Sequence, residues 1–272
     1  MFRAALELRR PFWTTGAHAM DKGAHFHKCD FQVHTPRDLG WIGNDATSDA
    51  DRKAYAEELI LACRNKGLEA IAITDHHDFS FFPYVKSAAR AEVDEKGQPI
   101  RDEDKVVVFP GIELTLTAPN CQALLILDAD FPENLLPSVL TALSITQAPP
   151  TDTKHAQVVR IPQSVINDLT HLYEVLNSHS YLTGRFIVFP NVTENGHGTL
   201  LRSGFANFYK SMPCVGGYTD GPVSKFGRGN RSSLVGITGQ VSSVPDLPSA
   251  LSAMGSRGQA SCSASSAGPT SA

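Results

Sequence analysis

Three groups of polar side chains stand directly after short apolar runs of this sequence. His34 follows FQV, Asp75 and His76 follow AIAIT, and Glu113 follows FPGI. In parallel α/β proteins the carboxyl ends of the strands meet at one face, so residues far apart in the sequence converge there. Imidazoles and carboxylates brought together in this way are typical ligands of Zn²⁺, Mn²⁺ or Fe²⁺. The pattern therefore predicts a metal or phosphate site.

Five apolar segments are expected to form the strands that position these residues. Each is rich in β-branched or aromatic residues and nearly continuously apolar, as strands covered on both faces are. They lie at 28–34, 68–75, 106–114, 122–128 and 185–192. In the first of them, strict alternation places Asp30, Gln32 and His34 on one side of the strand. Strands that alternate with helical segments predict an α/β fold with a mainly parallel sheet or barrel.

Two helices are marked by their caps and apolar spacing. Ser48 and Asp51 form a capping box, apolar residues recur at helical spacing after them, and Gly67 ends the helix. A second helix is expected over 163–176, where apolar residues form one stripe. Both helices connect predicted strands, which supports the α/β reading.

The chain is expected to hold one domain at 25–229, with an extension at 1–24 and a tail at 230–272. The tail is rich in Ser, Ala and Gly, a composition that buries too little apolar surface to become ordered. Within the domain, the charged stretch 91–105 is expected to be a solvated excursion. The stretch 141–162, which contains two adjacent prolines, is expected to be a long irregular loop.

Composition narrows the function classes. A net charge of −4 and a pI near 6.2 provide no overall basic field, so nucleic-acid binding would need a local patch. Five cysteines without a CxxC pair favour reduced thiols and a cytoplasmic protein. No apolar run approaches the roughly 20 residues of a membrane span, so no membrane partner is expected. GRGNRSS lacks the Gly-Lys-Ser/Thr core of a P-loop, which excludes it as a nucleoside-triphosphate site.

The motifs carry a family resemblance. FQVHT, ITDHHD and FPGIEL resemble the first three motifs of the PHP (polymerase and histidinol phosphatase) superfamily of metal-dependent phosphoesterases, usually spelled DxHxHT, TDH and GxE. CDFQVHTPRD, PNVTENGHGTLLRSGF and CVGGYTDG are similar to the PHP domain at the N-terminus of long proteins that continue into a DNA-repair-type ATPase. The resemblance covers roughly residues 25 to 230. It implies a distorted (βα)₇ barrel with up to three metal ions, which activate a water against a phosphate ester.

The resemblance also implies roles for individual residues. His34 corresponds to the second imidazole of the first motif, His76 to the ligand of TDH with Asp75 supporting it, and Glu113 to a carboxylate that can bridge two metals. Asp75, His76 and Glu113 are therefore the expected catalytic residues. The family's last motif, an Asp-x-His, is absent, so the domain is expected to be truncated at its C-terminal end.

Three imidazoles of the family pattern are amides in this chain, at Gln32, Gln122 and Asn191. Amide oxygen is a harder donor than imidazole, so the site is expected to prefer Mg²⁺ or Mn²⁺ over Zn²⁺ and to bind the ion weakly. The full set of expected metal ligands is Gln32, His34, His76, Glu113, Gln122 and Asn191.

Further polar residues are candidates for contact with a phosphate. Arg202 and Lys210 are expected to bind it. The guanidinium of Arg202 matches a phosphate in geometry as well as charge, and Lys210 supplies a positive charge. His197 is a candidate replacement for a lost imidazole. Asp78 is equally consistent with a capping role and with a ligand contact.

Two function classes follow, with a third that fits less well. The first is a phosphoesterase acting on nucleotides or nucleic-acid ends, including 5′–3′ exonuclease-like action, with Mn²⁺, Zn²⁺ or Mg²⁺ as cofactor. The second is a catalytically degenerate module that binds nucleic acid or regulates a linked ATPase. The reduced ligand count favours weak or lost catalysis. An amidohydrolase would need a lysine at a strand end, and none of the candidate strands ends in one.

Overall fold

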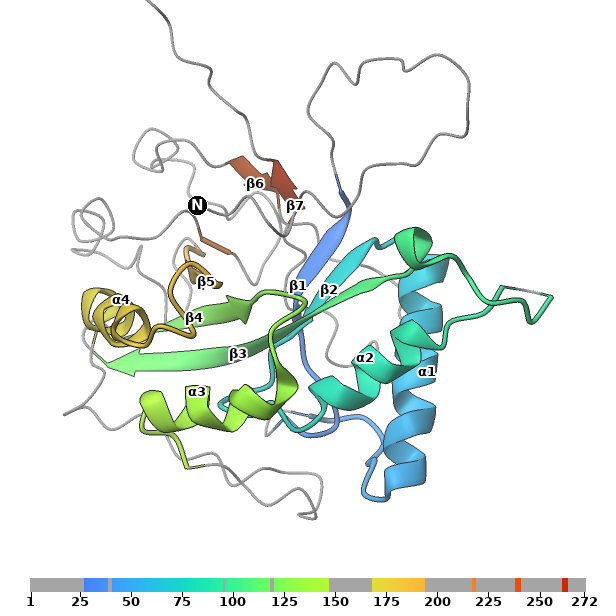
Figure 1. Cartoon of the computed structure of the whole chain (residues 1–272), viewed down its shortest axis with the longest axis horizontal. Helices are drawn as coiled ribbons and strands as arrows, with labels where there is room; N and C mark the ends of the chain where they lie inside the picture. The colour runs from blue at the N-terminus through green and yellow to red at the C-terminus, as the bar shows by residue number, and fades with distance from the viewer. Residues whose placement is uncertain are drawn as a thin grey trace, which may run out of the picture.

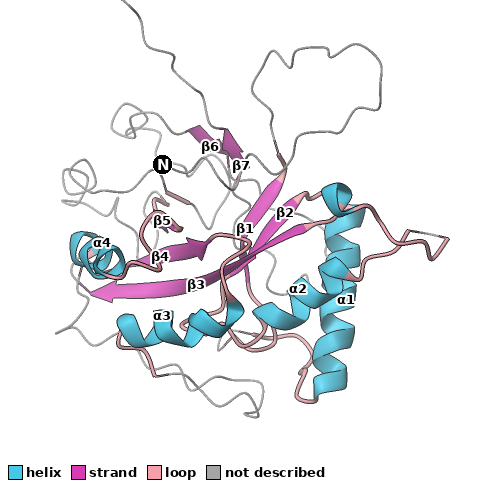
Figure 2. Ribbon diagram, in the orientation of Figure 1, coloured by secondary structure: helices cyan, strands magenta, loops and turns pink. Residues whose placement is uncertain are grey.

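The computed structural model describes residues 27–38, 41–94, 96–117, 120–146, 168–193, 217–218, 238–240 and 261–263. Its strands are β1 (Cys29–Val33), β2 (Ala70–Ile73), β3 (Val107–Thr117), β4 (Asn120–Leu127), β5 (Phe186–Pro190), β6 (Thr238–Gln240) and β7 (Ser261–Ser263). Its helices are α1 (Asp49–Asn65), α2 (Phe82–Arg90), α3 (Leu136–Ala142) and α4 (Leu169–Ser178), with short 3₁₀ turns at Asp102–Asp104 and Glu133–Leu135. Figure 1 shows this arrangement and Figure 2 separates helices from strands. The predicted extension and, apart from β6 and β7, the predicted tail lie outside the described residues.

The first five strands form a mixed sheet in the order β1-β2-β3-β4-β5. β1, β2 and β3 are parallel, but β4 is antiparallel to both β3 and β5, so the expected mainly parallel sheet is wrong at this point. Only residues 118 and 119 join β3 to β4, and a parallel return needs a crossover of a dozen or more residues. The reversal puts the first residues of β4 at the same edge as the carboxyl ends of β1 to β3.

The closed (βα)₇ barrel stays a prediction. Among the described residues, β1 lies at one edge of the five-stranded sheet and β5 at the other. Beyond β5, Asn191 forms a single parallel bridge with Tyr218. The described part of the chain is therefore a mixed α/β fold. None of its helices is long and apolar enough to cross a bilayer.

The first helix begins and ends where the sequence predicts. Ser48 Oγ accepts a hydrogen bond from Asp51 N while the Asp51 carboxylate accepts one from Ser48 N, and Gly67 after the helix has φ of 65°. The predicted helix over 163–176 corresponds to α4, but Asp168 caps it and Leu169 is its first residue. Residues 163–167 lie outside the described part of the chain, and helices α2 and α3 were not predicted individually.

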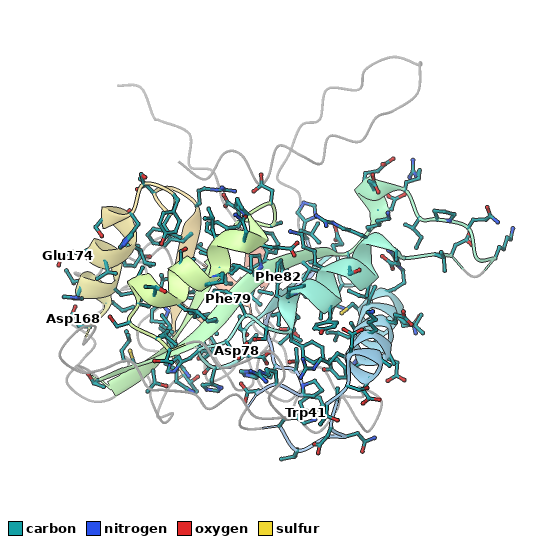
Figure 3. The ribbon with its side chains drawn as sticks, turned by 60° about the horizontal axis from the view of Figure 1, so that its bottom comes forward. Trp41, Asp78, Phe79, Phe82, Asp168 and Glu174 are labelled. Carbon is teal, nitrogen blue, oxygen red and sulfur yellow. The ribbon has the colours of Figure 1, made fainter. Side chains whose placement is uncertain are left out.

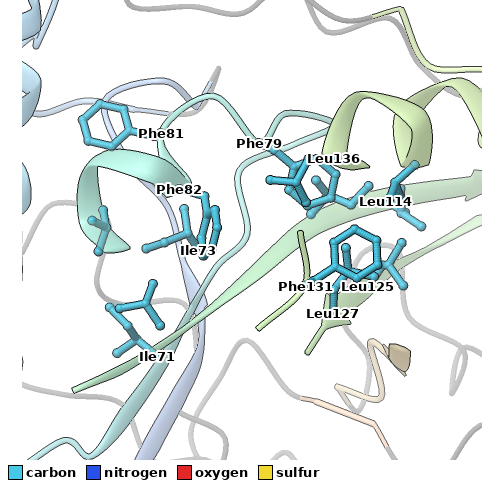
Figure 4. Close-up of a cluster of buried hydrophobic side chains, with 14 of the residues drawn as sticks. Ile71, Ile73, Phe79, Phe81, Phe82, Leu114, Leu125, Leu127, Phe131 and Leu136 are labelled. Atoms are coloured by element: carbon cyan, nitrogen blue, oxygen red, sulfur yellow. The ribbon is translucent and has the colours of Figure 1, made fainter. Parts of the chain in front are cut away.

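Two hydrophobic clusters occupy the two faces of the sheet. The larger joins the strands to all four helices, and its members include Ile73 and Leu114 from strands and Phe82 and Leu136 from helices (Figure 4). The smaller lies on the opposite face and consists of Ala72, Leu124, Ile126, Phe189 and Tyr218, with Phe31, Phe109 and Ile187 packed against it. Glu113 alternates with the helix-facing Ile112 and Leu114 of β3, so it shares the face of the smaller cluster.

A β-bulge in β1 changes which side chains share a face. Asp30 pairs with Ile71 but Val33 pairs with Ile73, so one extra residue lies between Asp30 and Val33 in β1. Ile71 and Ile73 belong to the larger cluster, which places Asp30 on the helix side and Gln32 on the opposite side. The predicted common face for Asp30, Gln32 and His34 is therefore wrong for Asp30. Strict alternation fails here because a bulge shifts the pleat by one residue.

Gly111 of the FPGIEL motif lies where β2, β3 and β4 approach closely. A Cβ at this position would lie 2.8 Å from Thr74 Cγ2 and 3.0 Å from the Leu125 carbonyl oxygen, and a backbone oxygen cannot move aside easily. We expect Gly111→Ala to lower the free energy of unfolding by about 1–3 kcal/mol, the usual cost of overpacking. Urea unfolding measures this change. Gly97→Ala is the control, because its Cβ has open space and its cost is limited to backbone strain at φ of 72°.

Candidate metal centre

Four side chains, from β3 and from the segments that follow β1 and β2, come together where β1 and β2 end. His34 follows β1, Asp38 lies in the turn after it, His76 follows β2, and Glu113 belongs to β3. His76 and Glu113 form a parallel bridge that continues the β2–β3 ladder past Ile73. We call His34, Asp38, His76 and Glu113 the imidazole–carboxylate cluster. Its members come from the motifs predicted to converge, with Asp38 added.

The two imidazoles of the cluster lie face to face between the two carboxylates. Their rings are stacked with centroids 5.2 Å apart and planes 8° apart. Each Nδ1 faces Asp38 Oδ2, at 3.0 Å for His34 and 2.7 Å for His76. Each Nε2 faces Glu113, at 3.1 Å from Oε2 for His34 and 3.7 Å from Oε1 for His76. Asp38 thus contacts the Nδ1 atoms of both rings, and Glu113 lies beside their Nε2 atoms.

Asp38 is the member that sequence reasoning missed. Its Oδ2 accepts hydrogen bonds from both the backbone N and the ring Nδ1 of His76. The turn after β1 positions it, since Asp38 N donates to Thr35 O. A carboxylate on the far nitrogen of a ligating histidine fixes the tautomer and orientation of the ring. The available signal was its spacing four residues after His34 in HTPRD, which places a carboxylate one turn beyond the imidazole.

Asp75 supports the cluster from behind. Its two carboxylate oxygens accept hydrogen bonds from Thr35, one from the backbone N and one from Oγ1, each at 2.7 Å. Burial and the nearby Asp38 raise the pKa of Asp75 to about 7, against the opposing effects of His34 and Thr35. Asp75 therefore connects the turn after β1 to the end of β2, and its expected role in supporting His76 stays a prediction.

Glu113 is wholly buried and receives two further hydrogen bonds. Gln32 Nε2 donates to Glu113 Oε2 at 3.1 Å, and Tyr218 Oη donates to Glu113 Oε1 at 3.2 Å. Tyr218 was not predicted as a site residue, although it stands in the CVGGYTDG stretch that carries the resemblance. No periodicity in the sequence assigns this tyrosine to the site, because its place depends on the single bridge to Asn191.

The other predicted amides are placed differently from each other. Gln122, at the start of β4, has its Nε2 3.4 Å from His76 Nε2, so the structure brings it to the cluster. Asn191 is buried; its Oδ1 accepts a hydrogen bond from Thr193 N, and its backbone N donates to Gln122 O at 2.8 Å. The predicted residues Arg202, Lys210 and His197 lie outside the described part of the chain.

Burial and opposite charges together control protonation in the cluster. Burial alone lowers the pKa of His34, but Asp38 and Glu113 outweigh it and raise the pKa to about 10. Burial likewise opposes the charged form of Glu113, yet His34 and His76 outweigh it and lower the pKa. The same two imidazoles lower the pKa of Asp38 against its burial. Without a metal, His34 is therefore held as a cation between the carboxylates of Asp38 and Glu113.

This electrostatic balance predicts how the stability of the metal-free chain varies with pH. His34 binds its proton more tightly folded than unfolded, so its contribution is fully present below about pH 6.5 and is lost as the pH rises toward about 10. Glu113 contributes above its unfolded pKa, about 4.3, and loses this as the pH falls through its lowered value. We expect maximal stability at about pH 5–6.5, measured as urea midpoints in the presence of a chelator. An equal alkaline loss in His34→Gln would contradict this assignment.

The donor atoms of the cluster fit a divalent metal ion. One ligand atom from each of His34, His76 and Glu113 lies within 4.8 Å of the others. Both ring nitrogens of His34 and Oε1 of Gln32 are buried and have no partner with hydrogen-bond geometry among the described residues. Two ligands each about 2.1 Å from one ion in tetrahedral geometry are about 3.4 Å apart, which resembles the separations of Glu113 from the two imidazoles.

A buried ion pair joins the two loops that carry the cluster. Arg37 Nε donates to Asp78 Oδ2 at 3.1 Å, with exposed side-chain fractions of 2% and 3%. Asp78 also accepts a hydrogen bond from Ser80 N, so it caps a turn before α2 and does not itself cap that helix (Figure 3). Between the pair and the cluster, His77 has φ of 55°, and its Nε2 accepts a hydrogen bond from Thr115 N at 3.3 Å.

The chain is only weakly similar to the known proteins with which it was compared. No protein-family model and no curated protein matches the chain. PsfC from Pseudomonas syringae is similar over 61% of this chain, with 15% identity and a TM-score of 0.33, and the match covers only 55% of PsfC. A proposed metal-dependent phosphoesterase from Bifidobacterium adolescentis is similar over 78% of this chain and 83% of its own, with 11% identity and a TM-score of 0.38. These TM-scores are too low to establish a shared fold.

Proposed function

We propose that this chain is a metal-dependent phosphoesterase that hydrolyses a phosphate ester of a nucleotide or of a nucleic-acid end. One observation carries the proposal. The Nε2 atoms of two stacked imidazoles, the buried His34 and the partly exposed His76, lie beside the Glu113 carboxylate, while the single oxygen Asp38 Oδ2 lies against both Nδ1 atoms. This is the arrangement of histidines whose far nitrogens a carboxylate orients for metal binding.

Each residue has a distinct part in this function. His34, His76 and Glu113 would hold a divalent ion, which supplies charge neutralisation for a phosphate and lowers the pKa of a water. Asp38 keeps both imidazoles oriented, and Asp75 fixes the turn that carries Asp38 through Thr35. The His76 side chain is 19% exposed, whereas those of His34 and Glu113 are at most 1% exposed. A phosphate ester would therefore reach the cluster at His76.

A second candidate is a non-catalytic module that binds nucleic acid or regulates a linked ATPase. The contacts of two amides favour it. Gln32 donates to Glu113, and Gln122 lies against His76, so neutral side chains occupy places beside the cluster where the family pattern has imidazoles. In this candidate the charges within the cluster balance one another and stabilise the fold without turnover.

Metal analysis combined with an assay separates the two candidates. The full chain, stripped with a chelator, is loaded with Mn²⁺ and assayed on a 5′-phosphorylated oligonucleotide and a nucleotide 3′,5′-bisphosphate. We expect bound Mn²⁺ and Mn²⁺-dependent release of phosphate or nucleotide. Metal binding without hydrolysis of either substrate would favour the non-catalytic module. No binding under saturating Mn²⁺ would contradict the phosphoesterase.

A further inference from the structure

We infer that the imidazole–carboxylate cluster binds a single metal ion, because hydrogen-bond donors of the chain itself occupy the positions that a second ion would need. The inference rests on the proposed function for the presence of any ion at all. It departs from the resemblance, which implies up to three ions with Glu113 bridging two of them. Three sets of contacts support it.

The first contact is a hydrogen bond to Oε2 of Glu113. Gln32 Nε2 donates to Oε2 at 3.1 Å, and both side chains are buried. A bridging carboxylate gives one oxygen to each of two cations. An amide N–H that donates to Oε2 stabilises the negative charge on this oxygen and occupies one of its lone pairs. Oε2 can then serve the ion that it shares with His34, but it is poorly placed to take another on the side of Gln32.

The second contact is a hydrogen bond to the other oxygen of Glu113, Oε1. Tyr218 Oη donates to Oε1 at 3.2 Å, and Tyr218 is 1% exposed. His76 Nε2 lies 3.7 Å from Oε1. One donor on each oxygen of Glu113 leaves a lone pair on each for a metal. The ligand atoms of His34, His76 and Glu113 lie within 4.8 Å of one another, so a single ion between the two imidazoles takes up this remaining capacity.

The third set of contacts concerns the other group of possible ligands, His34, Asp38 and Asp75, whose atoms also lie within 4.8 Å of one another. Both oxygens of Asp75 accept short hydrogen bonds from Thr35, and Asp38 Oδ2 accepts two from His76. An ion there would also need the His34 nitrogen that faces Asp38. Protein donors therefore already contact both oxygens of Asp75 and the Oδ2 of Asp38, so the two carboxylates of this second group are engaged.

Substitution of Gln32 tests the inference directly. In Gln32→His the amide donor is replaced by an imidazole that can ligate, and in Gln32→Glu by a carboxylate that cannot donate and attracts a cation. The full-length wild type and both variants are stripped, saturated with Mn²⁺ alone, and measured by native mass spectrometry and by electron paramagnetic resonance. We expect one Mn²⁺ per wild-type chain with an uncoupled spectrum. We expect two per chain, magnetically coupled, in at least one variant.

A surface control and the alternative outcomes complete the design. Gln98→His adds an imidazole at an exposed turn and should leave the stoichiometry at one. Two or more Mn²⁺ bound to the wild type would overturn the single-ion inference and leave the phosphoesterase proposal intact. One ion with no hydrolysis would overturn the phosphoesterase and keep the inference. One ion in both Gln32 variants would overturn the role given to Gln32, and no bound ion would overturn both proposals.

Discussion

Replacing His76 with alanine is expected to lower Mn²⁺ affinity and hydrolysis of a phosphate ester by more than about a hundredfold each. Loss of an outer partner of a metal ligand already costs about 10–100-fold, and His76 is a ligand in the proposed centre. Its removal also takes a donor from Asp38, whose Oδ2 accepts two hydrogen bonds from this residue, although the backbone N remains. It further removes the most exposed member of the cluster, where substrate is expected to approach.

The measurement pairs Mn²⁺ titration by calorimetry with the oligonucleotide assay. His171→Ala is the matched control, because His171 lies at the start of α4, away from the cluster. Its hydrogen bond to Asp168 is donated by the backbone N, which the substitution keeps. The control should bind and hydrolyse as the wild type does. Unchanged Mn²⁺ affinity in His76→Ala, with native circular dichroism, would remove His76 from the metal centre and with it the proposed geometry.

Much of the sheet was predictable because its strands are nearly continuous apolar runs. The predicted segments at 28–34, 68–75, 106–114, 122–128 and 185–192 overlap β1 to β5, and the Ser48 capping box is confirmed. The direction of β4 was not predicted, although the short link between β3 and β4 contained that information. An apolar run marks a strand but does not give its direction, which depends on the length of the connection.

The candidate site was predictable where one strand end determined a residue, and not where two loops had to meet. His34 and His76 directly follow strands, Glu113 lies within β3 opposite His76, and the three lie together as expected. Asp38 and Tyr218 reach the cluster from a turn and from a single-residue bridge, so no periodic pattern marks them. Asp30 was misplaced because a bulge leaves no signature in the alternation of CDFQV.

The two loops at the site also supply the largest expected effect on stability. We expect Asp78→Ala to lower the free energy of unfolding by about 3–5 kcal/mol, the cost of removing one partner of a buried ion pair. Arg37 would stay almost wholly buried without this carboxylate, and the turn would lose the hydrogen bond from Ser80 N. Asp78→Asn separates these effects, because an amide oxygen keeps an acceptor for Ser80 and removes only the charge.

Urea unfolding of Asp78→Ala, Arg37→Ala and the double variant measures the coupling between the two side chains. Since the charge that remains is the main penalty, the double variant should be destabilised by less than the sum of the single variants. The exposed pair of Asp49 and Lys53, with exposed side-chain fractions of 63% and 65%, is the matched control, and Asp49→Ala should leave the midpoint nearly unchanged. Additive single and double variants would show that Asp78 does not stabilise these loops through Arg37. A coupled pair, together with weaker Mn²⁺ binding in Asp78→Asn, would show that the ion pair also positions Asp38 and His76 for the metal.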